Sequence, residues 1–497
     1  MCGIIGYVGN KDAAPILIDS LKKLEYRGYD SSGVGILSND AALIVRKSKG
    51  KIRFLEELIQ KGPLPYSRIG ISHTRWATHG LPCDINSHPH TDNKNRFALV
   101  HNGIIENYRQ LKERLQKQGH RFHSETDTEV IVHLIASLYK GDFVMAVRQA
   151  LKQLKGAFAV GVICQEHPDV LVAARIGSPL IVGLGEGENF IASDVPAILD
   201  RTRRVIYLKD GQIAVLSADK VQVMDFNGQK APVKVDTVTF SAGSAQKEGF
   251  AHFMLKEIHE QPEVLKGMLS LRCKGGRLNL EGLELSDKAL AAAKKIFIVG
   301  CGTAYHAGLV GKYAIESLAR VSVEVETSSE FRYRQPLVDK NTLVIAVSQS
   351  GETADTLAAV REAQAKGAKV VAICNVIGSS LAREADGVLY THAGPEIGVA
   401  STKAYTAQLT MMYLVALKLG AVRGSITPAR VKQMIKTLSK VPQLYLQILK
   451  KAPSVQKIAE ANSHFGCFLY LGRNINYPSA LEGALKLKEI SYIPAEG

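Results

Sequence analysis

The sequence predicts an α+β domain followed by a doubly wound α/β domain, and three observations support this fold class. The chain of 497 residues is too long for one ordinary domain. Residues 1 to about 240 carry many short apolar runs punctuated by glycine, which is typical of strands. From about residue 295, apolar strands alternate regularly with helical stretches, as in a parallel sheet covered by helices on both faces.

The first region predicts mainly strands. They are expected at 2–8, 68–72, 97–100, 157–163 and 170–174, with helices near 11–24 and 129–139. Residues 241–250 are small and polar, which suits a linker. An amphipathic helix is expected at about 252–270. We therefore expect a first domain over 2–240 and a linker with a connecting helix over 241–287.

The second region predicts strands at 296–299, 343–347 and 370–374, and helices at 304–318, 354–366 and 403–419. Its domain is expected over 288–430. The stretch FLYLG at 468–472 resembles IFIVG at 296–300, so a second copy of the unit begins within 455–497. One strand and one helix bury too little of a sheet. The sequence thus predicts that the chain stops before its last domain is complete.

The composition argues against several classes of protein. The chain is 46% apolar and 22% charged, as in a soluble globular protein, and no apolar run reaches the roughly 18 residues of a membrane span. Seven scattered cysteines without a CxxC pair favour a reducing cytoplasm. The net charge of +15 is spread along the chain without a nucleic-acid module. It could attract anionic sugar phosphates or be merely a solvated surface.

Cys2 follows the initiator methionine and is small enough to allow its removal. Removal would place a thiol and a free α-amine on one residue. The α-amine has a pKa near 8, so it can take the thiol proton. Cys2 would then be nucleophile and base together. Taken alone, a cysteine at this position is usually without function.

Five motifs in register change that interpretation. They are MCGIIG at 1–6, EYRGYDSSG at 25–33, HTRWATHG at 73–80, HNGIIEN at 101–107 and SETDTE at 124–129. Together they closely resemble the glutaminase domain of class II, N-terminal-nucleophile glutamine amidotransferases. The resemblance implies their four-layer αββα sandwich and an acyl transfer that begins with attack of Cys2 on glutamine.

The resemblance assigns roles that suit this chemistry. Asn102, through its side chain, and Gly103, through its backbone N–H, match the oxyanion hole of the family. Arg75 matches the arginine that binds the glutamine α-carboxylate, and Asp127 the acid that holds the α-ammonium. A surface ion pair is the ordinary alternative for Arg75 and Asp127.

Further glutamine-site residues follow from the same motif. We expect the glutamine site to be lined by Trp76, Thr78 and His79. Trp76 matches a residue of the family that is thought to gate the passage of ammonia. His88 and His90 lie in a stretch rich in histidine and could offer two metal ligands. No carboxylate or cysteine falls at a recognised ligand spacing, and the resembled family uses no catalytic metal here. We therefore predict no metal and no other cofactor.

The second region carries the hexapeptide SQSGET at 348–353 directly after a predicted strand and before a helix. Such a turn presents backbone N–H groups to a phosphate, although a simple helix N-cap is the alternative. With GCGT at 300–303 and EIGVASTK at 396–403, it resembles sugar isomerase (SIS) domains, which bind phosphosugars. The resemblance implies that the phosphate of the sugar phosphate and nearby hydroxyls are bound by Thr303, Ser348, Gln349, Ser350 and Thr353. It also implies that Val399, through its backbone, and Ser401 contact the sugar.

The start of the second copy places Glu482, Lys486 and Glu489 on one face of a helix. Spacing alone favours an exposed, ion-paired stripe. The resemblance instead makes Glu489 the glutamate that moves a proton between sugar carbons 1 and 2, with Lys486 as its partner.

A glutaminase domain joined to tandem SIS domains implies an enzyme of amino sugar synthesis that makes glucosamine-6-phosphate from glutamine and fructose-6-phosphate, as a homodimer. A Schiff-base lysine and a ring-opening histidine of that family would lie beyond Gly497, so we expect synthase activity to be in doubt. Two rivals remain. Other class II amidotransferases need a phosphoribosyl-pyrophosphate loop or an ATP motif that is not visible here. A non-catalytic phosphosugar regulator would not need Cys2, Arg75, Asn102 and Asp127.

Overall fold

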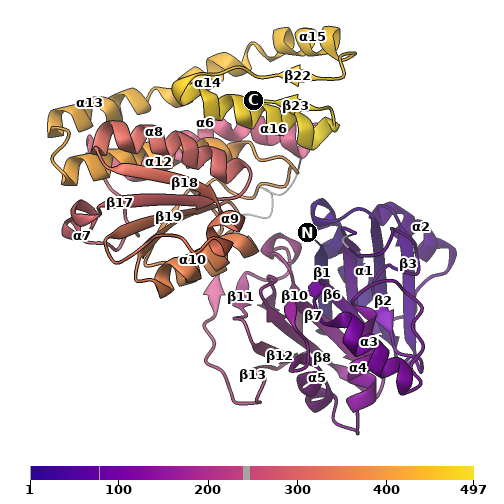
Figure 1. Ribbon diagram of the computed structural model, residues 1–497. Coiled ribbons are helices and arrows are strands. Elements are labelled where there is room, and N and C mark those ends of the chain that lie inside the picture. Colours follow the sequence, from indigo (N-terminus) through magenta and orange to yellow (C-terminus); the bar gives the residue numbers. More distant parts are fainter. Residues whose placement is uncertain (1, 78, 239–246) are drawn as a thin grey trace. The chain divides into compact units, whose positions relative to one another are not determined.

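The computed structural model describes residues 2–77, 79–238 and 247–497 (Figure 1). These residues divide into two compact units, unit 1 over 1–245 and unit 2 over 246–497. Each unit has sheets and hydrophobic cores of its own. The predicted linker falls largely on 241–246, which lie outside the described residues.

Unit 1 contains two antiparallel sheets. In the described residues the first has eight strands in the order β14-β11-β9-β10-β1-β4-β2-β3. Their bounds are β1 (Gly3–Gly9), β2 (Ser31–Ser38), β3 (Leu43–Lys49), β4 (Ser67–Arg75), β9 (Ile181–Leu184), β10 (Glu188–Ala192), β11 (Arg204–Tyr207) and β14 (Asp236–Thr237). The second sheet, again counted over the described residues, has six strands in the order β13-β12-β8-β7-β6-β5. They are β5 (His90–Thr91), β6 (Phe97–Ile105), β7 (Gly156–Cys164), β8 (His167–Ile176), β12 (Gln212–Leu216) and β13 (Val221–Asp225).

Helices cover the outer face of each sheet, which gives four layers (Figure 1). Helices α1 (Ala13–Lys22) and α2 (Ile52–Lys61) pack on the first sheet. Helices α3 (Tyr108–Lys117), α4 (Glu129–Leu138) and α5 (Phe143–Leu151) lie on the second. A third core, with Ile71, Val100 and Ile191 at 0% exposure, fills the space between the sheets. Short 3-10 turns occur at η1 (Glu25–Arg27) and η2 (Val195–Ala197).

Unit 2 is built on a parallel sheet in the order β18-β17-β19-β20-β21, five strands in the described part of the chain. The strands are β17 (Lys295–Gly300), β18 (Ser322–Thr327), β19 (Thr342–Ser348), β20 (Lys369–Cys374) and β21 (Gly387–Tyr390). They bury continuous runs such as Val344, Ile345 and Ala346, as strands covered on both faces do. The predicted parallel sheet is confirmed.

Two cores lie on opposite faces of this sheet. One packs it against α6 (Phe253–Arg272), α7 (Asp287–Ala292), α8 (Thr303–Ala319) and α12 (Lys403–Val422). The other packs it against α9 (Ser328–Tyr333), α10 (Ala354–Ala365) and α11 (Ser380–Glu384). A small hairpin, β15 (Cys273–Lys274) with β16 (Arg277–Leu278), follows α6.

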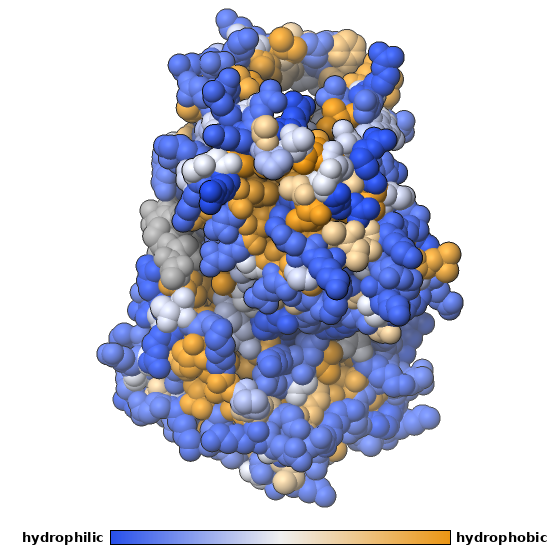
Figure 2. Space-filling view, turned by 90° about the vertical axis from the view of Figure 1, so that its left-hand side faces the viewer, coloured by the Kyte–Doolittle hydropathy of each residue, from blue (hydrophilic) through white to orange (hydrophobic). Residues whose placement is uncertain are grey.

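The C-terminal part of unit 2 is largely helical and carries many exposed apolar side chains. It contains α13 (Pro428–Leu438), α14 (Val441–Leu449), α15 (Ala452–Asn462), η4 (Asn474–Asn476) and α16 (Tyr477–Ser491). The predicted strand at 468–472 is only β22 (Phe468–Leu469), paired with β23 (Ala495–Glu496) in a parallel ladder. Figure 2 shows apolar patches within a mostly hydrophilic face. One of these patches lies at the top of the view, at the same height as α15 in Figure 1.

No helix in the described residues is both long and apolar enough to span a bilayer.

Candidate active sites

Strand pairing places Cys2 beside the end of β4. Strand β1 runs antiparallel to β4 with Gly3 opposite Thr74, so Cys2 lies next to Arg75 and Trp76. The Cys2 sulfur accepts a hydrogen bond from the Trp76 N–H at 3.3 Å. Burial raises the pKa of the Cys2 thiol, while the Trp76 hydrogen bond and the charge of Arg75 act in the opposite direction. The thiol therefore needs a base close by to become a thiolate.

Asn102 comes to the same point from the other sheet. Its side-chain amide donates to the Cys2 carbonyl oxygen at 3.0 Å. The His73 Nε2 contacts the Asn102 Oδ1 at 2.9 Å and so fixes which end of the amide faces Cys2. Gly103 has φ +128°, and a Cβ there would lie 2.0 Å from the carbonyl oxygen of Ala157. Only glycine fits this position.

Arg75 is buried at the end of β4, where the chain turns back around its guanidinium. It donates to the carbonyl oxygens of His79 and Gly80, the latter at 3.0 Å. In the described residues, no carboxylate lies within ion-pair distance of Arg75. The alternative of a surface ion pair is therefore wrong for Arg75, which is buried and has no carboxylate partner there, and the guanidinium retains its capacity to bind a carboxylate.

Asp127 is also buried, and its Oδ2 accepts the Ile105 N–H at 2.7 Å. This bond ties Asp127 to the end of β6, the strand that carries Asn102 and Gly103. His79 contacts the Glu125 carbonyl oxygen at 3.0 Å, and Thr78 lies outside the described residues.

Four histidines of unit 1 are buried around this site and are held neutral. Burial lowers the pKa of His73 to about 3, and it lowers those of His88, His90 and His101 as well. The rings of His73 and His88 stack with centroids 4.1 Å apart. Neutral rings here act as fixed hydrogen-bonding groups near Asn102.

In unit 2, the candidate residues gather where the strand order of the sheet reverses. Strands β17 and β19 are neighbours, but the next strands lie on opposite sides, β18 beside β17 and β20 beside β19. Ligands of open α/β sheets bind at the carboxyl ends of the strands at such a switch point. Thr303 follows β17 and Ser348 ends β19, so both lie at this edge.

The loop 348–353 has a fixed shape of its own. The Ser348 hydroxyl contacts the Thr353 hydroxyl at 3.1 Å and accepts the Gly351 N–H at 3.0 Å. The Ser350 hydroxyl accepts the Glu352 N–H at 3.2 Å, and the Gln349 carbonyl oxygen accepts the Asn375 N–H at 3.1 Å. The loop leads into α10, whose first N–H groups lack intrahelical partners. These features suit an anion.

Helix α16 brings its charged stripe to the first turn of α8. The Lys486 Nζ lies 3.1 Å from the Thr303 hydroxyl, 2.8 Å from Glu489 and 3.4 Å from Glu482. Glu482 is buried and accepts hydrogen bonds from Thr303 at 2.9 Å and from His306 at 2.8 Å. The alternative of a fully exposed stripe is wrong for Glu482, because α16 packs against α8.

Val399 and Ser401 lie in the loop between β21 and α12. Val399 is 56% exposed, whereas the Ser401 hydroxyl donates to Glu396 at 2.8 Å.

Sequence reasoning overlooked three residues that shape these sites. Arg27 donates to the Cys2 carbonyl oxygen at 3.1 Å, and Asp30 accepts the Ala77 N–H at 2.8 Å. His73 orients Asn102. All three lie within the motifs at 25–33 and 73–80, so membership of these motifs could have identified them. Over the described residues, no group of three or more His, Cys, Asp or Glu is placed to hold a metal ion.

Two family models match the chain, the glutamine amidotransferase domain at residues 73–200 and the SIS domain at residues 289–418. Curated relatives named glutamine–fructose-6-phosphate aminotransferase (isomerizing) match all of it. Those from Clostridium tetani and Aquifex aeolicus are 51% and 52% identical over 497 residues, and that from Symbiobacterium thermophilum is 52% identical over 499. The chain covers 81% of each relative.

Two solved structures are similar to parts of the chain. The C-terminal domain of glucosamine-fructose-6-phosphate aminotransferase from Francisella tularensis is 42% identical, with a TM-score of 0.49, over 50% of this chain and 70% of that one. The glutamine phosphoribosylpyrophosphate amidotransferase from B. subtilis is 20% identical, with a TM-score of 0.40, over 75% of this chain and 81% of that one.

Proposed function

We propose a function from one premise: this chain belongs to the family of the isomerizing glutamine–fructose-6-phosphate aminotransferases. It is 51% identical over its full length to one of them and covers 81% of that relative. The proposed reaction takes the amide nitrogen of glutamine and places it on carbon 2 of fructose-6-phosphate. Glutamate and glucosamine-6-phosphate are the products.

The first half of the reaction belongs to unit 1. Once Met1 is removed, the α-amine of Cys2 takes the thiol proton, and the thiolate attacks the glutamine side-chain amide. Asn102 and Gly103 stabilise the oxyanion, while Arg75 and Asp127 hold the α-carboxylate and α-ammonium. Ammonia leaves, and water hydrolyses the glutamyl thioester to glutamate and free Cys2.

The second half belongs to unit 2. The loop 348–353 and Thr303 bind the phosphosugar, with Val399 and Ser401 beside it. Ammonia adds to carbon 2 of the open sugar and water leaves, which gives an imine. Glu489 moves a proton from carbon 1 to carbon 2, and Lys486 keeps its carboxylate in position. The water consumed by the thioester balances the water released by the imine. The proton shift oxidises carbon 1 to the aldehyde and reduces carbon 2 to the amine within the same sugar, so no external reductant or oxidant enters.

One observation carries the glutaminase half. The Asn102 amide points at the Cys2 residue from 3.0 Å, and His73, at 2.9 Å, determines its orientation. A donor that is fixed before substrate arrives is what stabilisation of an oxyanion requires. A buried cysteine with only a packing role would not need this second support.

We also propose a homodimer in the cytoplasm that requires no cofactor. The seven cysteines are all free thiols, which is compatible with a reducing compartment. Sedimentation equilibrium would test the dimer. A monomer at micromolar concentration would contradict it.

The function is tested by incubating the purified chain, with Met1 removal verified by intact mass, with glutamine in the presence and absence of fructose-6-phosphate. Glutamate and glucosamine-6-phosphate are quantified. Both products are expected from the complete reaction. Glutamate alone would limit catalysis by this 497-residue chain to unit 1. No glutamate from a chain with a free Cys2 amine would overturn the proposal.

A further inference from the structure

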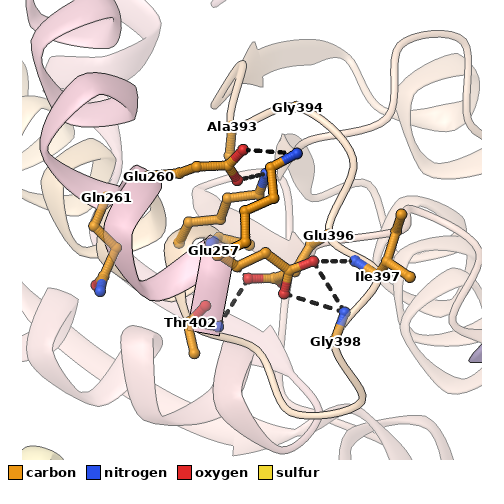
Figure 3. A network of polar contacts seen from close by, with 12 residues as sticks. Glu257, Glu260, Gln261, Ala393, Gly394, Glu396, Ile397, Gly398 and Thr402 are labelled. Carbon is orange, nitrogen blue, oxygen red and sulfur yellow. Dashed lines mark hydrogen bonds and ion pairs between the residues drawn. The ribbon is translucent and has the colours of Figure 1, made fainter. Parts of the chain in front are cut away.

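Beyond the residues that the proposed function uses, one buried carboxylate holds the backbone of the sugar loop. Glu257 lies on α6, and its side chain is aimed at the loop 394–402 between β21 and α12 (Figure 3). Its Oε1 accepts the Ile397 N–H at 2.5 Å and the Gly398 N–H at 3.0 Å, and its Oε2 accepts the Gly398 N–H at 3.1 Å. Glu257 is 2% exposed.

The close approach of this carboxylate depends on glycine. A Cβ on Gly398 would lie 2.5 Å from the Glu257 Oε2 and 3.3 Å from the Met254 Cα. A larger residue would displace the Glu257 carboxylate from the Gly398 N–H and press on the backbone of Met254. The loop therefore sits on Glu257 through its backbone, one residue before Val399.

A second carboxylate shapes the same loop from within. Glu396 accepts the Ser401 hydroxyl and the Thr402 N–H at 2.8 Å each, and the Ala404 N–H at 3.0 Å. Glu396 thus closes the loop upon itself, whereas Glu257 attaches it to α6. The two carboxylates flank Val399, the residue expected to present its backbone to the sugar.

We propose that Glu257 is a positioning residue for the phosphosugar: its carboxyl group holds the loop 394–402 against α6, so that Val399 and Ser401 face the ligand. This rests on the proposed function for the identity of the ligand. The contact between Glu257 and the loop is independent of it.

The charges around Glu257 make this contact sensitive to pH. Lys256 of α6 pairs with Glu248, which precedes the helix, at 3.2 Å and with Glu260 of the same helix at 3.4 Å. Glu260 also pairs with Lys403 of α12 at 2.6 Å, and Glu396 faces Glu257 from the loop. Burial raises the pKa of Glu257 to about 7, and the negative charge of Glu396 raises it further. The N–H groups of Gly398 and Ile397 and the positive charge of Lys403 lower it.

The sign of the effect follows from linkage. A solvated glutamate has a pKa near 4.3, so the packed arrangement binds a proton more tightly than an opened one. Packing of the loop on Glu257 is therefore firmest at low pH and loosens as the pH rises through about 7.

The first test needs no sugar. Amide hydrogen exchange of the peptide over 394–402, corrected for the intrinsic rate, is measured between pH 6 and 8.5. We expect its protection to fall several-fold across this range in the original chain and to stay constant in Glu257→Gln, which keeps one accepting oxygen and cannot ionise. Glu263→Gln, an exposed glutamate of the same helix, serves as the matched control and should behave like the original chain.

The second test measures fructose-6-phosphate affinity by calorimetry at each pH. The affinity of the original chain is divided by that of Glu257→Gln at the same pH, because the titration of the ligand itself cancels in this ratio. We expect this ratio to fall about tenfold from pH 6 to 8.5, and Glu257→Ala to bind at least tenfold more weakly than Glu257→Gln at pH 6. Circular dichroism verifies the fold of each variant.

The outcomes separate the two proposals. If the sugar binds all variants equally and loop exchange does not change, the role of Glu257 is wrong while the proposed function stands. If the original chain binds no fructose-6-phosphate but exchange depends on Glu257, the sugar assignment fails and the loop contact stands.

Discussion

The two candidate sites are organised by opposite physical means. In unit 1, Asn102 and His73 are buried, and burial keeps the histidines neutral. In unit 2, Lys486 lies between Glu482 and Glu489, and charged groups contact one another at the partly exposed edge of a sheet. Unit 1 thus fixes its donors by desolvation and packing, whereas unit 2 fixes its acid and base groups by ion pairs.

The buried histidines of unit 1 and the buried Glu257 of unit 2 predict opposite responses to acid. A buried neutral histidine takes up a proton only in the unfolded chain, so acid destabilises unit 1. Glu257, with a pKa raised to about 7, takes up its proton in the folded state, so acid down to about pH 4.5 stabilises unit 2 by up to about 3 kcal/mol. The expected effects below are ordered from the largest to the smallest.

Replacement of the nucleophile should separate the two units most clearly. Cys2→Ala removes the thiol that attacks glutamine, and glutamate release should fall on the order of 10⁴-fold or more. Cys467→Ala, an exposed thiol of unit 2, should leave the rate unchanged. A coupled glutamate assay measures both. Equal losses in the two variants would show that the thiol chemistry is not localised to Cys2.

Removal of the oxyanion donor should reduce turnover without changing the fold. Asn102→Ala is expected to lower kcat about 10²- to 10³-fold, with little change in KM, because the donor acts mainly in the transition state. Asn102→Asp, which keeps the shape but replaces the donor that faces the Cys2 carbonyl oxygen with an acceptor, should be as slow. A rise in KM with kcat intact would instead make Asn102 a ground-state contact.

Acid unfolding tests the contrast between the units directly. The pKa of His73 lies at about 3 in the folded chain and near 6.5 in the unfolded one, so its contribution is complete above pH 6.5 and is lost as the pH falls. His73 alone should lower the unfolding free energy of unit 1 by about 2 kcal/mol between pH 6.5 and 5.

The single tryptophan of the chain is Trp76, so urea titrations followed by tryptophan fluorescence report on unit 1. His88 and His90 should steepen the slope, since burial lowers their pKa values too. His464→Asn, an exposed histidine of unit 2, is the control and should not alter it. A unit 1 stability that does not change down to pH 5 would contradict the buried neutral cluster.

Loss of the central cation should give the smallest effect, because its pairs are partly solvated. Lys486→Met removes the cation that pairs with Glu482 and Glu489, while Thr303 and His306 still donate to Glu482, and unit 2 should lose about 1 kcal/mol. Lys488→Met, an exposed residue of the same helix, should cost less than about 0.5 kcal/mol. Thermal unfolding followed by exchange of unit 2 peptides measures the difference. Equal stabilities would make the network a surface feature.

Much of the fold follows from local sequence pattern. The alternation after residue 295 predicts β17, β19, β20, α8, α10 and α12 within a few residues, since buried parallel strands are continuous apolar runs. Helices α2, α3 and α5 were not singled out. In α2 and α3 most residues are half-buried or exposed, so the apolar period of these two helices is diluted. Helix α5 is different, because five of its nine residues are buried and apolar, and its short length is what leaves the pattern ambiguous.

For the candidate sites too, the sequence identifies some features and the tertiary structure alone reveals others. The motifs locate Cys2, Arg75 and Asn102 along the chain, but only the pairing of β1 with β4 and the packing of the two sheets bring them together. The burial of Glu482 depends on α8, which lies far away in the sequence, so helix spacing alone gave the wrong exposure. Glu257 carries no motif of its own, because its partner is the backbone at Ile397 and Gly398.

The central claim, that Cys2 is the nucleophile of a glutamine site, is tested most directly by covalent labelling. The chain freed of Met1 is treated with a glutamine-like diazo ketone, digested and mapped by mass spectrometry, with and without excess glutamine. We predict a single label on Cys2 that glutamine prevents, and no label on the partly exposed Cys83. A label on another residue, or glutamine hydrolysis that persists after Cys2 is fully labelled, would contradict the account.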